Sequence, residues 1–259
     1  MSAYERYVEA YRHTIEASIA LGGELTDPDW AAPTECPLWT VGDIYAHLAG
    51  GERWMASGHN TSAPPGGFSQ WVDSAVLARR DNSRAAVLDE LREVYRQRQA
   101  QLAEPTDPGT PAVYPWGGAT TLEGLMSIRA FDCWVHEQDI RRAVGQPGNL
   151  GSPAARLTAD TILRSTPRVV AKQAGAPPGA SVRLVATGEV PVDVTIRVHE
   201  EGRASAVPPD GLATAELRMT WEAFSRLACG RGEAAAYPIE VSGDRDLAAR
   251  VLANFAITP

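Results

Sequence analysis

The sequence is short of lysine, of cysteine and of positive charge. Lys172 is the single lysine among 24 basic residues, and 32 acidic residues give the chain a formal net charge of −8. This excess of negative charge argues against nucleic acid or an anionic membrane surface as a partner. Cys36, Cys133 and Cys229 are odd in number and far apart, which argues against a disulfide framework. We therefore expect a cytoplasmic protein in a reducing compartment.

Long hydrophobic runs are also absent from the sequence. No apolar stretch approaches the ~18 residues of a membrane-spanning helix, and the first residues, MSAYERYVEAYRH, lack the apolar core of a signal peptide. The 259 residues are 44% hydrophobic, which is enough for a core and suits one large or two small domains. We expect a soluble protein that binds no membrane.

One stretch, from Thr120 to Gly145, carries the clearest chemical pattern. It reads TTLEGLMSIRAFDCWVHEQDIRRAVG, and Thr120 with Glu123 predicts a capping box at the start of a helix that ends at Gly145. A polar stripe follows one face of this helix at spacings of three, four and three, formed by Arg129, Asp132, His136 and Asp139. A carboxylate and an imidazole four residues apart on an otherwise apolar helix suggest two metal ligands.

A third ligand is expected from a second helix in the segment CPLWTVGDIYAHLAGGERW. Thr40 with Asp43 predicts the N-cap of this helix, and His47 lies within its apolar stripe. Helical bundles build internal metal sites from inward side chains on facing helices. His47, Asp132 and His136 would supply two imidazoles and one carboxylate, and they would leave a coordination position open.

Other interpretations of these residues stay open from the sequence alone. His47 is also compatible with a core histidine, and Asp132 with His136 is compatible with a surface pair. Asp139 and Glu52 either orient metal ligands or are solvated helix-end charges. Cys133 beside the stripe is either a small buried hydrophobe or, like Glu52, a fourth ligand that would complete a structural site.

The pattern of the whole chain predicts an α+β protein with two domains, residues 1–150 and 151–259. The first domain reads as four helical regions, at 3–21, from Val41 onward, at 69–102 with a break near 81–83, and at 120–145. Residues 58–67 and 104–118 are expected to be loops. After a Pro/Gly-rich boundary at 146–153, we expect helices at 154–173, 221–228 and 244–254 and strands at 181–187, 192–199 and 213–220.

The segments CPLWTVGDIYAHLAGGERW and FDCWVHEQDIRRAVGQPG resemble the mycothiol-dependent maleylpyruvate isomerase family of the DinB-like superfamily, as does the tail from Thr220 with LACGRGE. The resemblance implies an N-terminal DinB-like four-helix bundle that holds a divalent metal, usually zinc, and a smaller C-terminal α+β domain. His47 and His136 match the two histidines of the family, whereas Asp132 stands where glutamate is frequent. Arg231 matches an arginine implicated in activity.

Together these features predict an enzyme that uses a metal and the thiol mycothiol as cofactors. Metal coordination deprotonates a thiol that is mostly protonated at neutral pH, and the thiolate would add to an electrophilic small-molecule substrate, as in an S-transferase or a cis-trans isomerase of maleylpyruvate type. Arg231 and Arg129 would hold carboxylates of the thiol or substrate. A thiol-independent metal hydrolase and a non-catalytic metal-binding protein remain alternatives, and the chain would be a monomer or a homodimer.

Overall fold

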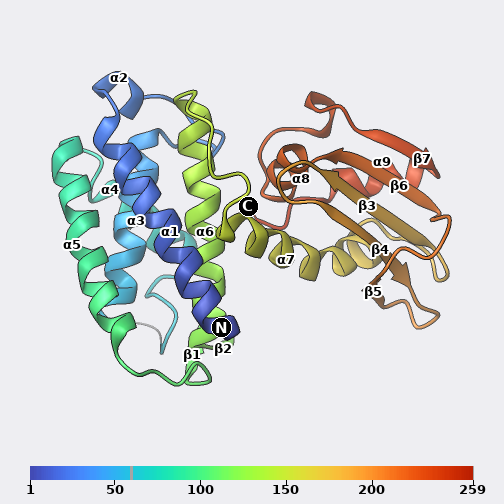
Figure 1. Cartoon of the computed structure of the whole chain (residues 1–259), viewed down its shortest axis with the longest axis horizontal. Coiled ribbons are helices and arrows are strands. Elements are labelled where there is room, and N and C mark those ends of the chain that lie inside the picture. Colours follow the sequence, from blue (N-terminus) through green and yellow to red (C-terminus); the bar gives the residue numbers. More distant parts are fainter. Residues whose placement is uncertain (59–60, 259) are drawn as a thin grey trace. The chain divides into compact units, whose positions relative to one another are not determined.

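The computed structural model describes residues 1–58 and 61–258 and divides the chain into two compact units, Met1–Asn149 and Leu150–Pro259. The first unit is helical, and the second combines helices with a sheet, which confirms the predicted α+β class (Figure 1). Residues 59 and 60, within the predicted loop 58–67, lie outside the described residues. No helix of the described chain is long and apolar enough to cross a membrane.

The helical unit is built mainly from four long helices, α1 (Ala3–Glu24), α3 (Val41–Ala56), α5 (Arg84–Ala103) and α6 (Leu122–Ala143). Helix α1 packs mainly on α6, and α3 packs mainly on α5 (Figure 1). Two short helices, α2 (Asp27–Trp30) and α4 (Phe68–Leu77), lie between them in sequence. The break predicted near 81–83 is confirmed, because the hydroxyl of Ser83 caps a new helix by accepting from the Ala86 amide.

Local capping fixes the start of α3, the helix that carries His47. Thr40 accepts from the Asp43 amide, and the Asp43 carboxylate accepts from the Thr40 amide, so the predicted capping box is present. This reciprocal bonding satisfies two backbone donors that a helix start otherwise leaves free. The register of α3, and with it the inward direction of His47, is therefore set at the first turn.

The start of α6 differs from the prediction. Thr120 belongs to strand β2 (Ala119–Thr121), which pairs with β1 (Pro111–Val113) in a hairpin. Strand β1 lies in the segment 104–118 that was expected to be a loop, and β2 includes the expected start of the helix. Pairing with Ala112 keeps the backbone of Thr120 extended, so the cap moves to Thr121, whose hydroxyl accepts from the Gly124 amide. The predicted Thr120–Glu123 capping box is therefore wrong, although α6 ends before Gly145 in the left-handed region (φ +65°), as expected.

The second unit contains a five-stranded sheet in the order β5-β4-β3-β6-β7, in which β3 and β6 are parallel and the other pairs are antiparallel. The predicted strands correspond to β3 (Ser181–Thr187), β4 (Val192–Val198) and β6 (Ala215–Thr220). The prediction missed the short edge strands β5 (Ala204–Val207) and β7 (Glu240–Gly243). The helices are α7 (Pro153–Arg168), which continues as a π-helical turn (Val169–Gln173), α8 (Trp221–Ala228) and α9 (Arg245–Ala253).

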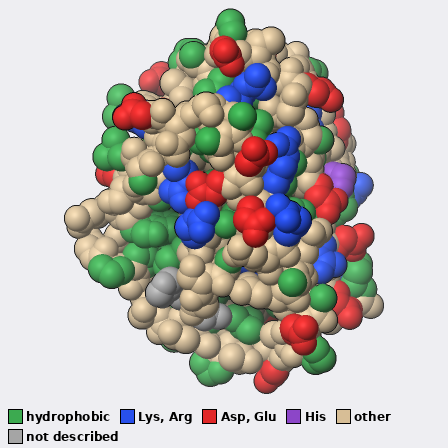
Figure 2. Space-filling view, turned by 90° about the vertical axis from the view of Figure 1, so that its left-hand side faces the viewer, with side chains coloured by type: hydrophobic (Ala, Val, Ile, Leu, Met, Phe, Trp, Pro, Cys, Tyr) green, Lys and Arg blue, Asp and Glu red, His purple; other side chains and the backbone are tan. Residues whose placement is uncertain are grey.

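Acidic and basic side chains are interspersed on the outer face of the helical unit (Figure 2). Ion pairs also link segments of this unit: Arg79, which follows α4, pairs with Glu90 of α5 at 2.7 Å, and Arg80 pairs with Asp43 of α3 at 2.9 Å. A face of mixed sign presents no continuous positive field to a nucleic acid.

Candidate metal centre

The structure brings the three predicted metal ligands together in the helical unit. His47 comes from α3, and Asp132 and His136 come from successive turns of α6. Their ligand atoms all lie within 4.8 Å of one another. The Nε2 atom of His47 is 3.5 Å from Asp132 Oδ2, and that of His136 is 3.6 Å from Asp132 Oδ1. Within the described chain, this is the one cluster of three or more His, Cys, Asp or Glu side chains with such spacing.

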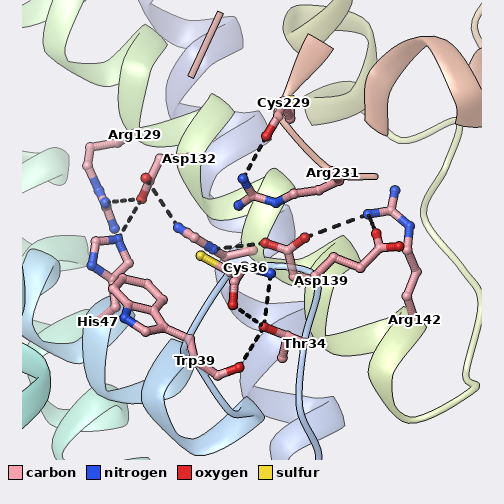
Figure 3. Close-up of polar contacts among 12 residues, drawn as sticks. Thr34, Cys36, Trp39, His47, Arg129, Asp132, Asp139, Arg142, Cys229 and Arg231 are labelled. Carbon is pink, nitrogen blue, oxygen red and sulfur yellow. Dashed lines mark hydrogen bonds and ion pairs between the residues drawn. The ribbon is translucent and has the colours of Figure 1, made fainter. Parts of the chain in front are cut away.

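The imidazole of His136 is oriented by the carboxylate of Asp139. Its Nδ1 lies 3.2 Å from the carboxylate of Asp139, which is fully buried and pairs in turn with Arg142 at 3.7 Å (Figure 3). A carboxylate of this kind keeps the proton on Nδ1 and leaves Nε2 free to bind a metal. The alternative that Asp139 is a solvated helix-end charge is therefore wrong.

His47 is buried but has no hydrogen-bond partner. Neither Nδ1 nor Nε2 finds one among the described residues, and both atoms are shielded from solvent. Burial lowers the pKa of His47, against the opposing pull of the Asp132 charge, so the imidazole is neutral at pH 7. Buried polar atoms are usually satisfied. The Nε2 atom makes no hydrogen bond and lies 3.5 Å from the Asp132 carboxylate, so it is placed to bind a cation.

Asp132 is held by a buried chain of charges. The Arg129 guanidinium donates to Asp132 Oδ2 at 2.6 Å and to Glu52 Oε1 at 2.6 Å (Figure 3). Tyr11 of α1 donates to the other oxygen of Glu52 at 2.5 Å. Burial raises the pKa of Asp132, but the adjacent His47 and Arg129 outweigh it and hold the pKa well below the usual range. Asp132 is therefore a carboxylate, as a metal ligand must be.

Glu52 and Cys133 are not members of the cluster. Glu52 is fully buried and engaged by Arg129 and Tyr11, so the interpretation that placed it in solvent is wrong. The thiol of Cys133 accepts from Arg129 at 3.2 Å, and burial raises its pKa. With neither among the clustered donors, the site has three protein donors, the number typical of catalytic rather than structural zinc.

A small residue makes room for the Arg129 guanidinium. Gly51 lies one turn beyond His47 on α3, and a Cβ built there would sit 3.1 Å from Arg129 Nη1. Such a contact is tighter than ordinary van der Waals packing, so a side chain at this position would displace the guanidinium. Arg129 can therefore reach both Glu52 and Asp132 because position 51 has no side chain.

Arg129 and Arg231 were both predicted to bind carboxylates of the thiol or substrate. Arg129 is largely buried and engaged by Glu52, Asp132 and Cys133. Arg231 lies in the second unit between Gly230 (φ +70°) and Gly232 (φ +75°), and it donates to the Cys229 carbonyl at 2.6 Å. The Gly-Arg-Gly segment is thus a turn, and the role of both arginines in ligand binding stays a prediction.

The sequence did not reveal two residues that contact this centre. Tyr11 reads as one more apolar position in the stripe of α1, and Trp39 precedes its helix in a loop. The Trp39 ring lies 5.1 Å from the ring of His47 and 5.8 Å from that of His136. Only the tertiary packing of α1 and of the loop on α3 and α6 shows that both contact the site.

Comparisons with known proteins agree with this architecture. The model of the mycothiol maleylpyruvate isomerase N-terminal domain matches residues 11–141, and that of the MDMPI C-terminal domain matches residues 156–250. A crystal structure of the mycothiol-dependent maleylpyruvate isomerase is similar at 14% identity and a TM-score of 0.62, and that of a histidine-to-alanine mutant at 12% and 0.59. Each comparison covers 93% of both chains.

The two solved structures are too distant in sequence to show more than a common fold. No curated protein sequence matches the chain significantly. The family models, in contrast, cover most of both units, and the first alone spans half of the chain. The chain belongs to the mycothiol-dependent maleylpyruvate isomerase family.

Proposed function

We propose that this protein is a metal-dependent enzyme that uses mycothiol as cofactor or cosubstrate, as a cis-trans isomerase of maleylpyruvate type or as an S-transferase. Membership in a family named for a mycothiol-dependent isomerase supports the thiol. The observation that supports the metal is His47, whose two buried ring nitrogens form no hydrogen bond and whose Nε2 lies 3.5 Å from the Asp132 carboxylate. An unsatisfied buried imidazole is costly unless something binds it.

His47, Asp132 and His136 would hold the ion, and two imidazoles with one carboxylate are a donor set that suits zinc. When bound, such an ion lowers the pKa of a thiol and polarises a carbonyl oxygen. The surrounding residues prepare the donors. Asp139 keeps the Nδ1 proton of His136 so that Nε2 is an acceptor, and Arg129 fixes Asp132 as the carboxylate.

The reaction class follows from a nucleophilic thiol and an electrophilic double bond. In the isomerase outcome, the thiol adds across a cis double bond, the new single bond rotates, and elimination of the thiol restores the double bond in the trans form. In the transferase outcome, the thiol remains attached to carbon. Arg231 and Arg129 would bind carboxylates of the thiol or substrate, a role that suits the planar guanidinium.

The testing experiment combines metal content with thiol-dependent turnover. We expect about one divalent ion per chain in the purified wild type and its loss in His47→Ala and His136→Ala, because each substitution leaves two donors. His13→Ala, which changes an exposed histidine of α1, is the matched control and should keep the ion. Metal is quantified by elemental analysis before and after loading with zinc.

Turnover of maleylpyruvate is then followed with and without mycothiol. Product that requires the thiol, and that both ligand variants fail to form, supports the proposal. Product formed without thiol would instead favour a metal-dependent hydrolase. Absence of metal from the zinc-loaded wild type would refute the metal site, and metal with no turnover of any electrophile would favour a non-catalytic binding protein.

A further inference from the structure

We infer that Trp39 is the positioning residue of His47 and that ring packing takes the place of the usual hydrogen bond. Metal-binding histidines almost always donate their second ring nitrogen to a carboxylate or carbonyl, which fixes the ring. His136 follows this rule through Asp139, but His47 has no such partner. The inference rests on the proposed metal site and concerns how one of its ligands is oriented.

The Trp39 ring is placed to hold both imidazoles. Its centroid lies 5.1 Å from that of His47, at 42° between the ring planes, and 5.8 Å from that of His136, at 32°. The two imidazoles are themselves 4.8 Å apart at 67°. Aromatic rings at these separations attract one another. The three rings form a compact triangle, in which His47 packs against both other rings and Trp39 is the one that does not itself bind the metal.

The backbone that carries Trp39 is fixed by a single threonine. The Thr34 hydroxyl donates to the Trp39 carbonyl at 2.9 Å and accepts from the Cys36 amide at 3.2 Å (Figure 3). The Thr34 amide also donates to the Trp39 carbonyl at 3.0 Å, and the Trp39 amide donates to the Cys36 carbonyl at 3.1 Å. These bonds close the loop 34–39 immediately before the cap of α3, so Trp39 is tied to the helix that carries His47.

An unfavourable conformation beside Trp39 supports the same interpretation. Leu38 has φ +67° and is 96% exposed. With Pro37 before it, Leu38 occupies the position of a type II turn that normally requires glycine. A leucine in the left-handed region is strained and persists only where its surroundings impose the conformation. Here the turn directs Leu38 outward and Trp39 toward the histidines. The strained conformation of the loop is therefore the one that places the Trp39 ring against them.

The experiment measures zinc affinity by competition with a chelator, in the full-length protein. We expect Trp39→Ala to bind zinc about 10- to 100-fold more weakly than wild type, the range for losing a group that orients a metal ligand. Trp39→Phe keeps a ring and should recover most of the affinity. Trp71→Ala is the matched control, because Trp71 lies in α4 against Trp54 and Phe68, away from the histidines, and its affinity should be unchanged.

Two further variants separate positioning from folding. Thr34→Val removes the hydroxyl bonds but keeps Trp39, and it should weaken zinc binding less than Trp39→Ala does. Leu38→Gly relieves the strained conformation and should leave the affinity unchanged. With Co²⁺ in place of zinc, the visible absorption bands of Trp39→Ala should shift in wavelength or intensity, because a reoriented imidazole alters the coordination geometry. A protein that merely lost stability would keep the wild-type bands.

The outcomes distinguish this inference from the proposed function. If His47→Ala abolishes zinc binding while Trp39→Ala and Thr34→Val bind as tightly as wild type, the metal site stands and the role of Trp39 is refuted. If wild type itself binds no zinc, both are refuted. Should Trp39→Ala fail to fold, Trp39→Phe and Thr34→Val decide the question, since wild-type affinity in Thr34→Val would contradict the inference.

Discussion

Two chains of charged side chains, each running from a glutamate through an arginine to an aspartate, end on α6. The distances within their ion pairs differ. In the first, Glu52 pairs with Arg129 at 2.6 Å, and Arg129 pairs with Asp132 at 2.6 Å. In the second, Glu35 pairs with Arg142 at 3.5 Å, and Arg142 pairs with Asp139 at 3.7 Å. Each arginine lies three residues from its aspartate on the helix. The same local arrangement therefore appears twice, once at each end of the metal stripe.

The two chains bury different carboxylates. In the first, the Glu52 side chain is 1% exposed and that of Asp132 is 26% exposed, whereas in the second Glu35 is 26% exposed and Asp139 is fully buried. A buried carboxylate that loses its cation is left uncompensated in a poorly solvating interior, but a partly exposed one regains water. The first chain should therefore support the fold as well as the metal ligand Asp132. The second should act mainly on the orientation of His136.

The largest effect on stability is expected when the first chain of charges loses its arginine. Arg129→Gln should lower the free energy of unfolding by about 3–5 kcal/mol, because it leaves Glu52 and Asp132 without their shared cation. Arg142→Gln is the paired variant, and its cost should be smaller, because Glu35 is 26% exposed and the buried Asp139, which lies 3.7 Å from Arg142, keeps its contact with His136 Nδ1. Urea denaturation of both metal-free proteins gives the two values. Equal losses would show that burial does not distinguish the chains.

A smaller effect is expected on the second chain. Asp139→Asn should weaken zinc binding by about 10- to 100-fold, since an amide no longer fixes the Nδ1 proton of His136 as the carboxylate does. Asp89→Asn, an exposed pair with Arg92 on α5, serves as the control. Zinc affinity comes from chelator competition at constant pH. Unchanged affinity in Asp139→Asn would mean that packing alone orients His136.

The smallest expected effect concerns the protonation of His47. Because burial lowers its pKa, NMR of the metal-free protein should show the ring titrating below the ordinary value of about 6.5. The unfolded chain then binds the proton more readily than the folded one, so the stability that this group contributes is present above about pH 6.5 and is lost as the pH falls through the folded pKa. A midpoint above 6.5 would mean that Asp132 outweighs burial.

The parts of this protein that depend on local spacing were predictable from its sequence. Thr40 and Asp43 are three residues apart, and their capping box fixes α3 without help from the rest of the chain. Asp132 and His136 are four apart, so any helix places them on one face. His47 alone is also compatible with a core histidine, and it could be joined to them only through the second motif and the family resemblance. The three donors meet as expected.

Contacts with other parts of the chain explain the sequence-based predictions that were wrong. Thr120 carries a good capping sequence, but its backbone pairs with Ala112 across a hairpin, a contact that the capping pattern of residues 120–123 does not include. Glu52 reads as a solvated charge near a helix end, and its burial depends on Tyr11 and Arg129, which are 41 and 77 residues away. The edge strands β5 and β7 have four residues each, too few to give a clear alternation.

The metal centre should be sensitive to substitution of Gly51, although this residue is not a ligand. The residue has no polar atom, contacts no ion and would be scored as ordinary helix interior, where alanine normally stabilises. Yet one added methyl group would press on the guanidinium that holds Asp132. In a saturation scan for function, position 51 should therefore tolerate substitution less well than an ordinary helix position, with a loss that grows with side-chain size, although no residue that performs chemistry is changed.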